Sequence, residues 1–235
     1  MICIVPAAGA GKRLGLGINK AFAQIGGAPL LVHTLKMLAQ TGLVSRAIVV
    51  VAPGEVAEGR ALLAKYAVDY FSALPYIVVA GGAERQDSVA NALASVTETE
   101  GYIAVHDGAR PFAGSEVFAR VLAAAVQCGA AIAAVSVKDT IKVVDDAGMV
   151  TATPARSSLR AVQTPQIFEL NLLKRAYANL ADHPAAVTDD ASVVELLGRP
   201  VAVAMGRYGN IKITTPEDLV FAENLLAQQE KNYGK

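Results

Sequence analysis

Short uninterrupted apolar runs recur along the chain, and helical patterns lie between several of them. The runs cover residues 2–5, 47–52, 76–80, 102–105, 130–137 and 201–205. Because these runs are apolar on both faces, they predict strands of a parallel sheet that is covered on two sides. Residues 29–40, 84–96 and 115–126 place apolar side chains along one side of a helix. We therefore predict an α/β fold with a doubly wound, mostly parallel sheet, whose ligands bind beyond the carboxyl ends of the strands.

One segment interrupts this alternation. Residues 140–144 and 149–153 are β-prone and flank an Asp-rich turn that ends at Gly148, which predicts a β-hairpin. A lone two-stranded ribbon is marginal in water, so we expect it to pack against something. Packing on its own domain is one alternative. Because the insertion interrupts the regular alternation of strands and helices, we favour a β-arm, residues 138–158, that packs around a second subunit. Residues 1–235 are predicted to form one domain.

The composition narrows the class of protein. The chain has 21 Lys+Arg and 21 Asp+Glu, and 53% of its residues are hydrophobic. This balance argues against a nucleic-acid binder, which needs excess cations to displace counterions from phosphates. The longest uncharged stretch, 121–137, is too short for a membrane span, and the first residues lack the basic leader of a signal peptide. With Cys3 and Cys128 as its two cysteines, we expect a cytoplasmic protein that does not bind membranes.

The first predicted strand runs into a glycine-rich, basic segment. Residues 6–13 read Pro-Ala-Ala-Gly-Ala-Gly-Lys-Arg, and Lys20 follows shortly. Glycine-rich backbone after a strand can bind a polyphosphate closely through its N–H groups, beside the cations Lys12, Arg13 and Lys20. A surface turn with scattered charges is the alternative. The segment is not a Walker loop, because Arg13 stands where Ser or Thr is needed. A dinucleotide fingerprint is also disfavoured, because residues 21–45 contain no acid to bind the ribose.

A second candidate group follows the strand predicted at 102–105. Residues 106–111 read His-Asp-Gly-Ala-Arg-Pro. Asp107, at the carboxyl end of a strand, suits Mg²⁺, which takes one or two protein carboxylates and completes its shell with water and substrate phosphates. Asp107 could instead cap the following turn. We interpret His106 as a hydrogen-bonded structural histidine, and the three histidines lack the HxxxH spacing of a zinc site.

Three further stretches are polar where core packing does not require it. Residues 81–88, Gly-Gly-Ala-Glu-Arg-Gln-Asp-Ser, either bind a base edge or cap a helix. Residues 188–192, Thr-Asp-Asp-Ala-Ser, are typical of a helix N-cap with acids on the positive helix end. Lys212 has alternating apolar neighbours, which predict a strand, and a helix is predicted to begin at Pro216. A lysine in such a strand often extends into solvent.

Taken together, these stretches resemble a known family. The motifs P-A-A-G-x-G-x-R, G-G-x-x-R-x-x-S-V, H-D-G-A-R-P, D-T-I-K, T-P-Q-x-F, T-D-D-A-S and N-I-K-I-T-T-P-E-D occur in this order, from Ile4 to about Glu223. They are similar to those of the 2-C-methyl-D-erythritol 4-phosphate cytidylyltransferases of the non-mevalonate isoprenoid pathway. The first motif marks the wider nucleotidyltransferase superfamily, whereas the later motifs together are specific. The resemblance implies a Rossmann-like nucleotidyltransferase fold that joins CTP to this polyol phosphate, with release of pyrophosphate.

The resemblance also implies roles for individual residues. Arg13, Lys20 and Lys212 would be the catalytic cations, of which Lys20 and Lys212 would hold the charge that builds on the α-phosphate of CTP. The residues implied to bind CTP are Ala7, Ala8, Gly9, Ala10, Gly11, Lys12, Arg13, Lys20, Gly82, Ala83, Ser88 and Asp107. Those implied to bind the polyol phosphate are Asp107, Arg110, Thr140, Arg156, Thr164, Thr188 and Lys212. Asp107 would lie near Mg²⁺, and Arg156 would reach the site of the neighbouring subunit in a homodimer formed through the β-arm.

One departure from the family concerns the flanks of Lys20. The family commonly has proline before this lysine and glutamine after it, where this chain has Asn19 and Ala21. A proline would restrict the backbone, so we expect the loop that carries Lys20 to be looser here.

Other activities remain as alternatives. Ribitol-5-phosphate cytidylyltransferases have similar motifs, but they commonly read R-N-E-S and T-D-A-C where this chain reads R-Q-D-S and T-D-D-A. A nucleotide-binding regulator without turnover would not need the transition-state cations. An NAD(P)-dependent dehydrogenase is disfavoured, because the ribose-binding acid is missing and because Tyr66, Tyr70 and Tyr177 are each followed at the fourth position by a residue other than lysine.

Overall fold

The computed structural model describes residues 1–9 and 19–233, including the side chains of residues 1–9 and 19–228. At its centre lies a seven-stranded sheet in the order β11-β7-β10-β6-β1-β4-β5. Neighbouring strands are parallel except where β10 runs antiparallel to β6 and β7. The strands are β1 (Ile2–Pro6), β4 (Arg46–Val51), β5 (Tyr76–Ala80), β6 (Tyr102–Val105), β7 (Ala130–Ser136), β10 (Arg160–Glu169) and β11 (Ala202–Met205). The α/β class and the mostly parallel sheet predicted from the apolar runs are confirmed.

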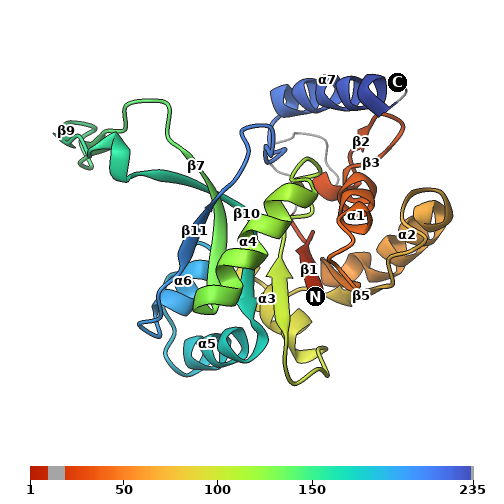
Figure 1. Ribbon diagram of the computed structural model, residues 1–235, viewed down its shortest axis with the longest axis horizontal. Helices are drawn as coiled ribbons and strands as arrows, with labels where there is room; N and C mark the ends of the chain where they lie inside the picture. Colours follow the sequence, from red (N-terminus) through yellow and green to blue (C-terminus); the bar gives the residue numbers. More distant parts are fainter. Residues whose placement is uncertain (10–18, 234–235) are drawn as a thin grey trace.

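Helices cover both faces of the sheet (Figure 1). Apolar residues of α1, α2 and α4 pack with one set of strand side chains, and those of α3, α5 and α6 pack with the other. On β1, for example, Cys3 and Val5 face the first set, whereas Ile2 and Ile4 face the second. The helices are α1 (Leu30–Gln40), α2 (Val56–Tyr70), α3 (Arg85–Ala94), α4 (Ser115–Cys128), α5 (Leu170–Asp182), α6 (Asp190–Glu195) and α7 (Pro216–Tyr233).

The apolar pattern misses one central strand, β10. This strand contains Pro165 and three buried polar residues, Gln163, Thr164 and Gln166. Their side chains find partners in other segments: Gln166 Nε2 donates to Asp189 Oδ2, and Gln163 Nε2 donates to Arg207 O. These contacts satisfy the polar groups in the core, so the strand needs no continuous apolar run.

The segment of Lys212 is not a strand. The segment between β11 and α7 has no ladder hydrogen bonds, and it crosses the end of the sheet beside the loop after β6. Its backbone is held there instead by a bond from Ile213 N to Ala109 O. Ile213 is buried against Leu30 of α1 in a small apolar cluster beneath α7. The alternation of apolar residues therefore reflects packing at a crossing point.

The predicted hairpin is confirmed as a protrusion between β7 and β10. Its strands β8 (Val143–Val144) and β9 (Val150–Ala152) pair antiparallel, and Figure 1 shows them far from the sheet. Asp145 shapes the turn, because its Oδ1 accepts hydrogen bonds from Ala147 N and Met149 N. Within the described residues, no helix is both long and apolar enough to cross a bilayer.

Candidate functional site

A cavity of about 360 Å³ lies where the carboxyl ends of β1, β5 and β6 meet. It has contributions from the segments after each of these strands, from the turn that carries Lys20 and from the crossing segment that carries Lys212. The lining residues are Pro6, Ala7, Ala8, Gly9, Lys20, Ala21, Gly82, Ala83, Glu84, Arg85, Ser88, Asp107, Ala109 and Lys212. Nine residues expected to bind CTP or to act in catalysis are thereby brought together around one cavity: Ala7, Ala8, Gly9, Lys20, Gly82, Ala83, Ser88, Asp107 and Lys212.

Asp107 is the electrostatic centre of this cavity. Its Oδ2 lies 2.7 Å from Lys212 Nζ and 3.7 Å from Arg110 Nε, and its Oδ1 lies 3.6 Å from Arg85 Nη2. Burial on its own would raise the pKa of Asp107, but these three cations outweigh it and hold the pKa well below its ordinary range. The carboxylate therefore stays ionised at neutral pH, and the wall around it carries a net positive charge.

Arg85 connects this carboxylate to a second buried acid. Its Nη2 donates to Asp190 Oδ2 at 2.7 Å, and Tyr177 Oη donates to Asp190 Oδ1 at 2.7 Å. Burial opposes the charge on Arg85, but Asp190 and Asp107 raise the pKa of its guanidinium above the ordinary value. Sequence reasoning did not assign Arg85, Tyr177 or Asp190 to the site. The sequence signal that could have identified Arg85 and Asp190 was the polarity of the motifs R-x-x-S and T-D-D-A-S. In the structure these two motifs pack against each other.

His106 and Thr164 hold the backbone of Asp107 from behind. Thr164 Oγ1 accepts a bond from Asp107 N at 3.0 Å and lies 3.1 Å from His106 Nδ1. His106 Nε2 lies 2.9 Å from Arg110 O, which can only accept, so a neutral imidazole carries its proton on Nε2 and the Thr164 hydroxyl donates to Nδ1. Burial lowers the pKa of His106 to about 4. His106 is thus a structural, uncharged histidine, as predicted, and the Thr164 hydroxyl faces this network.

Arg110 and Asn210 attach the crossing segment to the sheet. Arg110 Nη1 donates to Asn210 O at 2.7 Å, and Asn210 Nδ2 donates to Thr164 O at 2.8 Å. Burial lowers the pKa of Arg110, which Asp107 partly offsets. Asn210 is fully buried. Because Lys212 follows two residues later, these bonds fix the path that brings its side chain to Asp107.

The residues after β5 serve as a helix cap. Ser88 Oγ accepts from Gly82 N and donates to Glu84 O, both at 3.1 Å, and Asp87 Oδ2 accepts from Glu84 N. A side chain at position 82 would collide with Asp87 Cβ. Helix capping is therefore confirmed for this segment, while its binding to a base edge stays a prediction.

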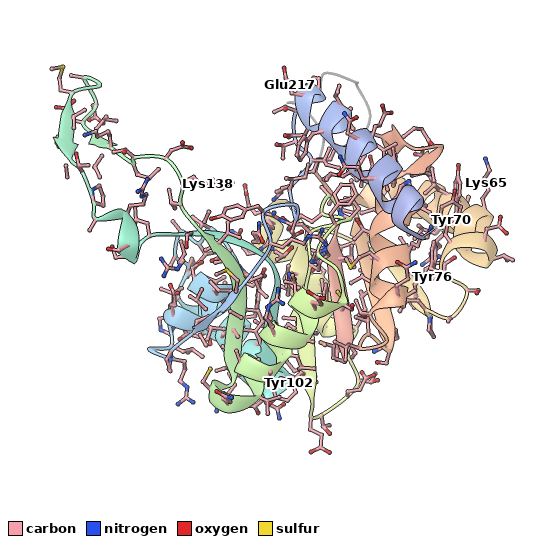
Figure 2. The ribbon with its side chains drawn as sticks, turned by 45° about the horizontal axis from the view of Figure 1, so that its top comes forward. Lys65, Tyr70, Tyr76, Tyr102, Lys138 and Glu217 are labelled. Atoms are coloured by element: carbon pink, nitrogen blue, oxygen red, sulfur yellow. The ribbon has the colours of Figure 1, made fainter. Side chains whose placement is uncertain are left out.

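The remaining expected residues lie elsewhere. Thr140 and Arg156 are exposed on the arm, where Arg156 Nη1 donates to Lys138 O at 2.7 Å. Lys138 lies at the root of the arm (Figure 2). Thr188 is exposed in the loop before α6, and the next residue, Asp189, is the N-cap, as that motif predicted. Four expected residues lie outside the described residues: Ala10, Gly11, Lys12 and Arg13.

A magnesium ion was expected at Asp107. No cluster of three or more His, Cys, Asp or Glu side chains suited to a metal occurs in residues 1–9 and 19–228. Asp107 nevertheless lines the cavity with an ionised carboxylate, and among the described residues its Oδ1 is in an ion pair only with Arg85, at 3.6 Å. One carboxylate fits Mg²⁺ when substrate phosphates and water supply the other ligands.

Comparisons with known proteins agree on one family. The family model described as 2-C-methyl-D-erythritol 4-phosphate cytidylyltransferase matches residues 1–228. The protein of that name from Bacillus mycoides is 48% identical over 228 residues, which cover 97% of this chain and 98% of the relative. The one from Geobacillus kaustophilus is 46% identical over 226 residues, 96% of each chain.

Solved structures give the same result. The crystal structure of 4-diphosphocytidyl-2C-methyl-D-erythritol synthase from Anaerococcus prevotii superposes with a TM-score of 0.82 at 32% identity, over 96% of this chain and 97% of that one. The 2-C-methyl-D-erythritol 4-phosphate cytidylyltransferase from Thermus thermophilus superposes with a TM-score of 0.76 at 35% identity, over 95% and 97%.

Proposed function

Since this chain belongs to the 2-C-methyl-D-erythritol 4-phosphate cytidylyltransferase family, we propose that the cavity around Asp107 is where its reaction takes place. The enzyme joins CTP and 2-C-methyl-D-erythritol 4-phosphate to give 4-diphosphocytidyl-2-C-methyl-D-erythritol and pyrophosphate. One observation carries the assignment of the site: Lys20 and Lys212, far apart in the sequence, line one cavity with Asp107. Both substrates are anionic, and this cavity has cationic side chains beside backbone that an anionic substrate can approach closely.

The reaction needs charge neutralisation and alignment. A phosphate oxygen of the polyol phosphate attacks the α-phosphorus of CTP in line, and the bond from this phosphorus to the pyrophosphate oxygen breaks. The nucleophile is already an anion, so no general base is required. In our proposal, Lys20 and Lys212 stabilise the charge that grows on the α-phosphate oxygens. Asp107, held by Lys212 and Arg85, orients Lys212 and offers one oxygen to Mg²⁺, which when bound would neutralise phosphate charge.

Nucleotide recognition is proposed for the neighbouring backbone. The segment from Ala7 would approach the triphosphate, and Gly82, Ala83 and Ser88 would bind the cytosine, because they line the same cavity. Arg110 and Thr188 would bind the polyol phosphate. The hydroxyl of Thr164 already bonds to Asp107 N and His106 Nδ1, so we assign it an indirect role through Asp107.

We also propose a homodimer formed through the arm. Apolar side chains on the arm are exposed to solvent, among them Val144 (54%), Met149 (66%) and Val150 (57%). Such a ribbon is stable only when it packs against another surface. Thr140 and Arg156, expected at the polyol phosphate, are not among the residues that line the cavity of their own chain. A second copy of the chain that receives the arm would account for both observations. The cytoplasmic location stays a prediction.

Release of pyrophosphate from CTP, Mg²⁺ and each of two polyol phosphates tests the assignment. We expect turnover with 2-C-methyl-D-erythritol 4-phosphate, and preferential turnover of ribitol 5-phosphate would contradict it. Lys212→Ala should lower kcat about a hundred- to a thousandfold, as loss of one donor to transition-state charge typically does. Lys65→Ala, an exposed lysine of α2 (Figure 2), is the matched control. An effect of Lys212→Ala on KM alone would refute its role.

Subunit mixing tests the dimer and the reach of Arg156. Arg156→Ala and Lys212→Ala should each be nearly inactive alone. If each site combines Lys212 of one subunit with Arg156 of the other, a random equal mixture regains about a quarter of the wild-type sites, because half of the dimers then hold one intact site. Sedimentation should show a dimer for both variants. A monomer, or no recovery of activity after mixing, would overturn the proposal.

A further inference from the structure

The position of Lys20 depends on the residue before it. Lys20 begins a short 3-10 turn, η2 (Lys20–Phe22), and Asn19 is its N-cap. Asn19 is 5% exposed, with φ −58° and ψ 125°. This φ is the value that a proline ring would impose, yet asparagine has no ring to impose it. Without a ring, the backbone is restricted to this value by contacts of Asn19 with its neighbours.

Hydrogen bonds of the Asn19 side chain take that role. Its Oδ1 accepts from Ala21 N at 3.0 Å, and its Nδ2 donates to Ala7 O at 2.7 Å and to Glu55 Oε2 at 2.6 Å. The amide thus uses both N–H groups and one acceptor site. The bond to Ala7 ties Asn19 to the end of β1, and the bond to Ala21 shapes the turn that contains Lys20.

Glu55 anchors this arrangement to a second strand end. It belongs to the turn after β4, and its Oε2 also accepts from Ala52 N at 3.3 Å, which orients the carboxylate. Hydrogen bonds to a charged acceptor are stronger than those between neutral groups. Asn19 is therefore fastened to the segments that follow β1 and β4, neighbouring strands of the sheet.

The Lys20 side chain lies where this anchoring matters. It lines the cavity, and a Cβ added at Gly9 would lie 3.5 Å from Lys20 Cε, so the lysine passes over the backbone of Gly9. A displacement of the η2 turn would move the ammonium group relative to a bound triphosphate.

We propose that Asn19, anchored by Glu55, is a positioning residue that holds Lys20 at the cavity wall for cytidylyl transfer. This inference rests on the role proposed above for Lys20. The Asn19 side chain acts through the lysine, so its loss changes the rate of the chemical step more than the affinity for CTP.

A double-mutant cycle tests whether Asn19 acts through Lys20. We expect Asn19→Ala to lower kcat about ten- to a hundredfold, because displacing a catalytic group by about 1 Å can cost that much, with KM for CTP changed less than threefold. Lys20→Ala should be slower still. Adding Asn19→Ala to Lys20→Ala should then produce no further loss. Asn224→Ala, whose Nδ2 donates to Val220 O within α7, is the control and should keep full activity.

A side-chain swap tests the contact with Glu55. Asn19→Asp keeps the acceptor for Ala21 N but places two carboxylates together, and it should be as slow as Asn19→Ala. Adding Glu55→Gln returns a donor to the contact between positions 19 and 55, whereas the bond to Ala7 O stays lost, so the double variant should recover only part of the lost rate. The swap keeps polar side chains of the same size at both positions, so it also supplies the test if Asn19→Ala does not fold.

Each outcome distinguishes this inference from the proposed function. If Asn19→Ala slows Lys20→Ala as much as it slows the wild type, Asn19 is merely structural and the inference fails alone. If the swap recovers nothing, the Glu55 anchor is wrong. If Lys20→Ala turns over at the wild-type rate, the role of Lys20 falls, and this inference falls with it.

Discussion

Replacing Arg85 with methionine removes a cation from a buried network while it keeps most of the side-chain length. Arg85 Nη2 lies 2.7 Å from Asp190 Oδ2 and 3.6 Å from Asp107 Oδ1. Asp190 is fully buried, and after the substitution its carboxylate would keep the Tyr177 hydroxyl and lose the guanidinium. The variant thus isolates what the cation contributes to a carboxylate that is buried in the intact protein.

The size of the effect follows from this burial. Removing one partner of a buried ion pair costs about 3–5 kcal/mol. The Arg85 side chain is 30% exposed, and water can enter the space it leaves, so we expect about 3 kcal/mol. For a chain of this size each kcal/mol lowers Tm by about 2–4 °C, which gives a decrease of roughly 6–12 °C.

Thermal unfolding followed by circular dichroism measures this decrease. Arg175→Met, at an exposed position of the neighbouring helix α5, is the matched control, with an expected change within about 0.5 kcal/mol. Adding Asp190→Leu to Arg85→Met should recover part of the loss, because no buried charge is then unpaired. If Arg85→Met unfolds at the same temperature as Arg175→Met, the reasoning about Asp190 is wrong.

Three further predictions concern residues around the cavity. Burial lowers the pKa of His106 to about 4. Between about pH 6.5 and 4, the unfolded chain therefore binds a proton at His106 that the folded chain does not bind. The free energy of unfolding should fall by about 3 kcal/mol as the pH is lowered across this window. In His106→Gln, denaturant titrations from pH 7 to 4 should show a correspondingly smaller loss. Thr164→Val should cost about 1–3 kcal/mol of unfolding free energy, because Asp107 N loses its acceptor, and Thr164→Ser should restore it; equal stability of the two variants would refute this role. Gly82→Ala should weaken CTP binding about tenfold or more in calorimetric titrations, since the new Cβ collides with Asp87 Cβ and displaces backbone proposed to bind the cytosine, and leaving a buried polar group unpaired costs about 1–3 kcal/mol; unchanged affinity would mean that Gly82 does not contact the nucleotide.

Much of the architecture could be predicted from local pattern. Each parallel strand is an apolar run, because a strand covered on both faces must be apolar on both. The cavity could also be anticipated, since the glycine-rich segment and Asp107 each follow such a run, and the carboxyl ends of parallel strands meet at one edge. β10 escaped prediction because its buried glutamines are satisfied by distant segments.

The local sequence gives the residue types of the site but not which of these residues pair with one another. The sequence alone determined the fold class, the arm and the presence of Lys20, Asp107 and Lys212, because periodicity and motifs are local properties. Only the tertiary structure decided that Arg85 pairs with Asp190 and that Asn19 is tied to Glu55. Such partners lie on different strand ends and helices, so their distance depends on the packing of the whole sheet and leaves no pattern in the chain.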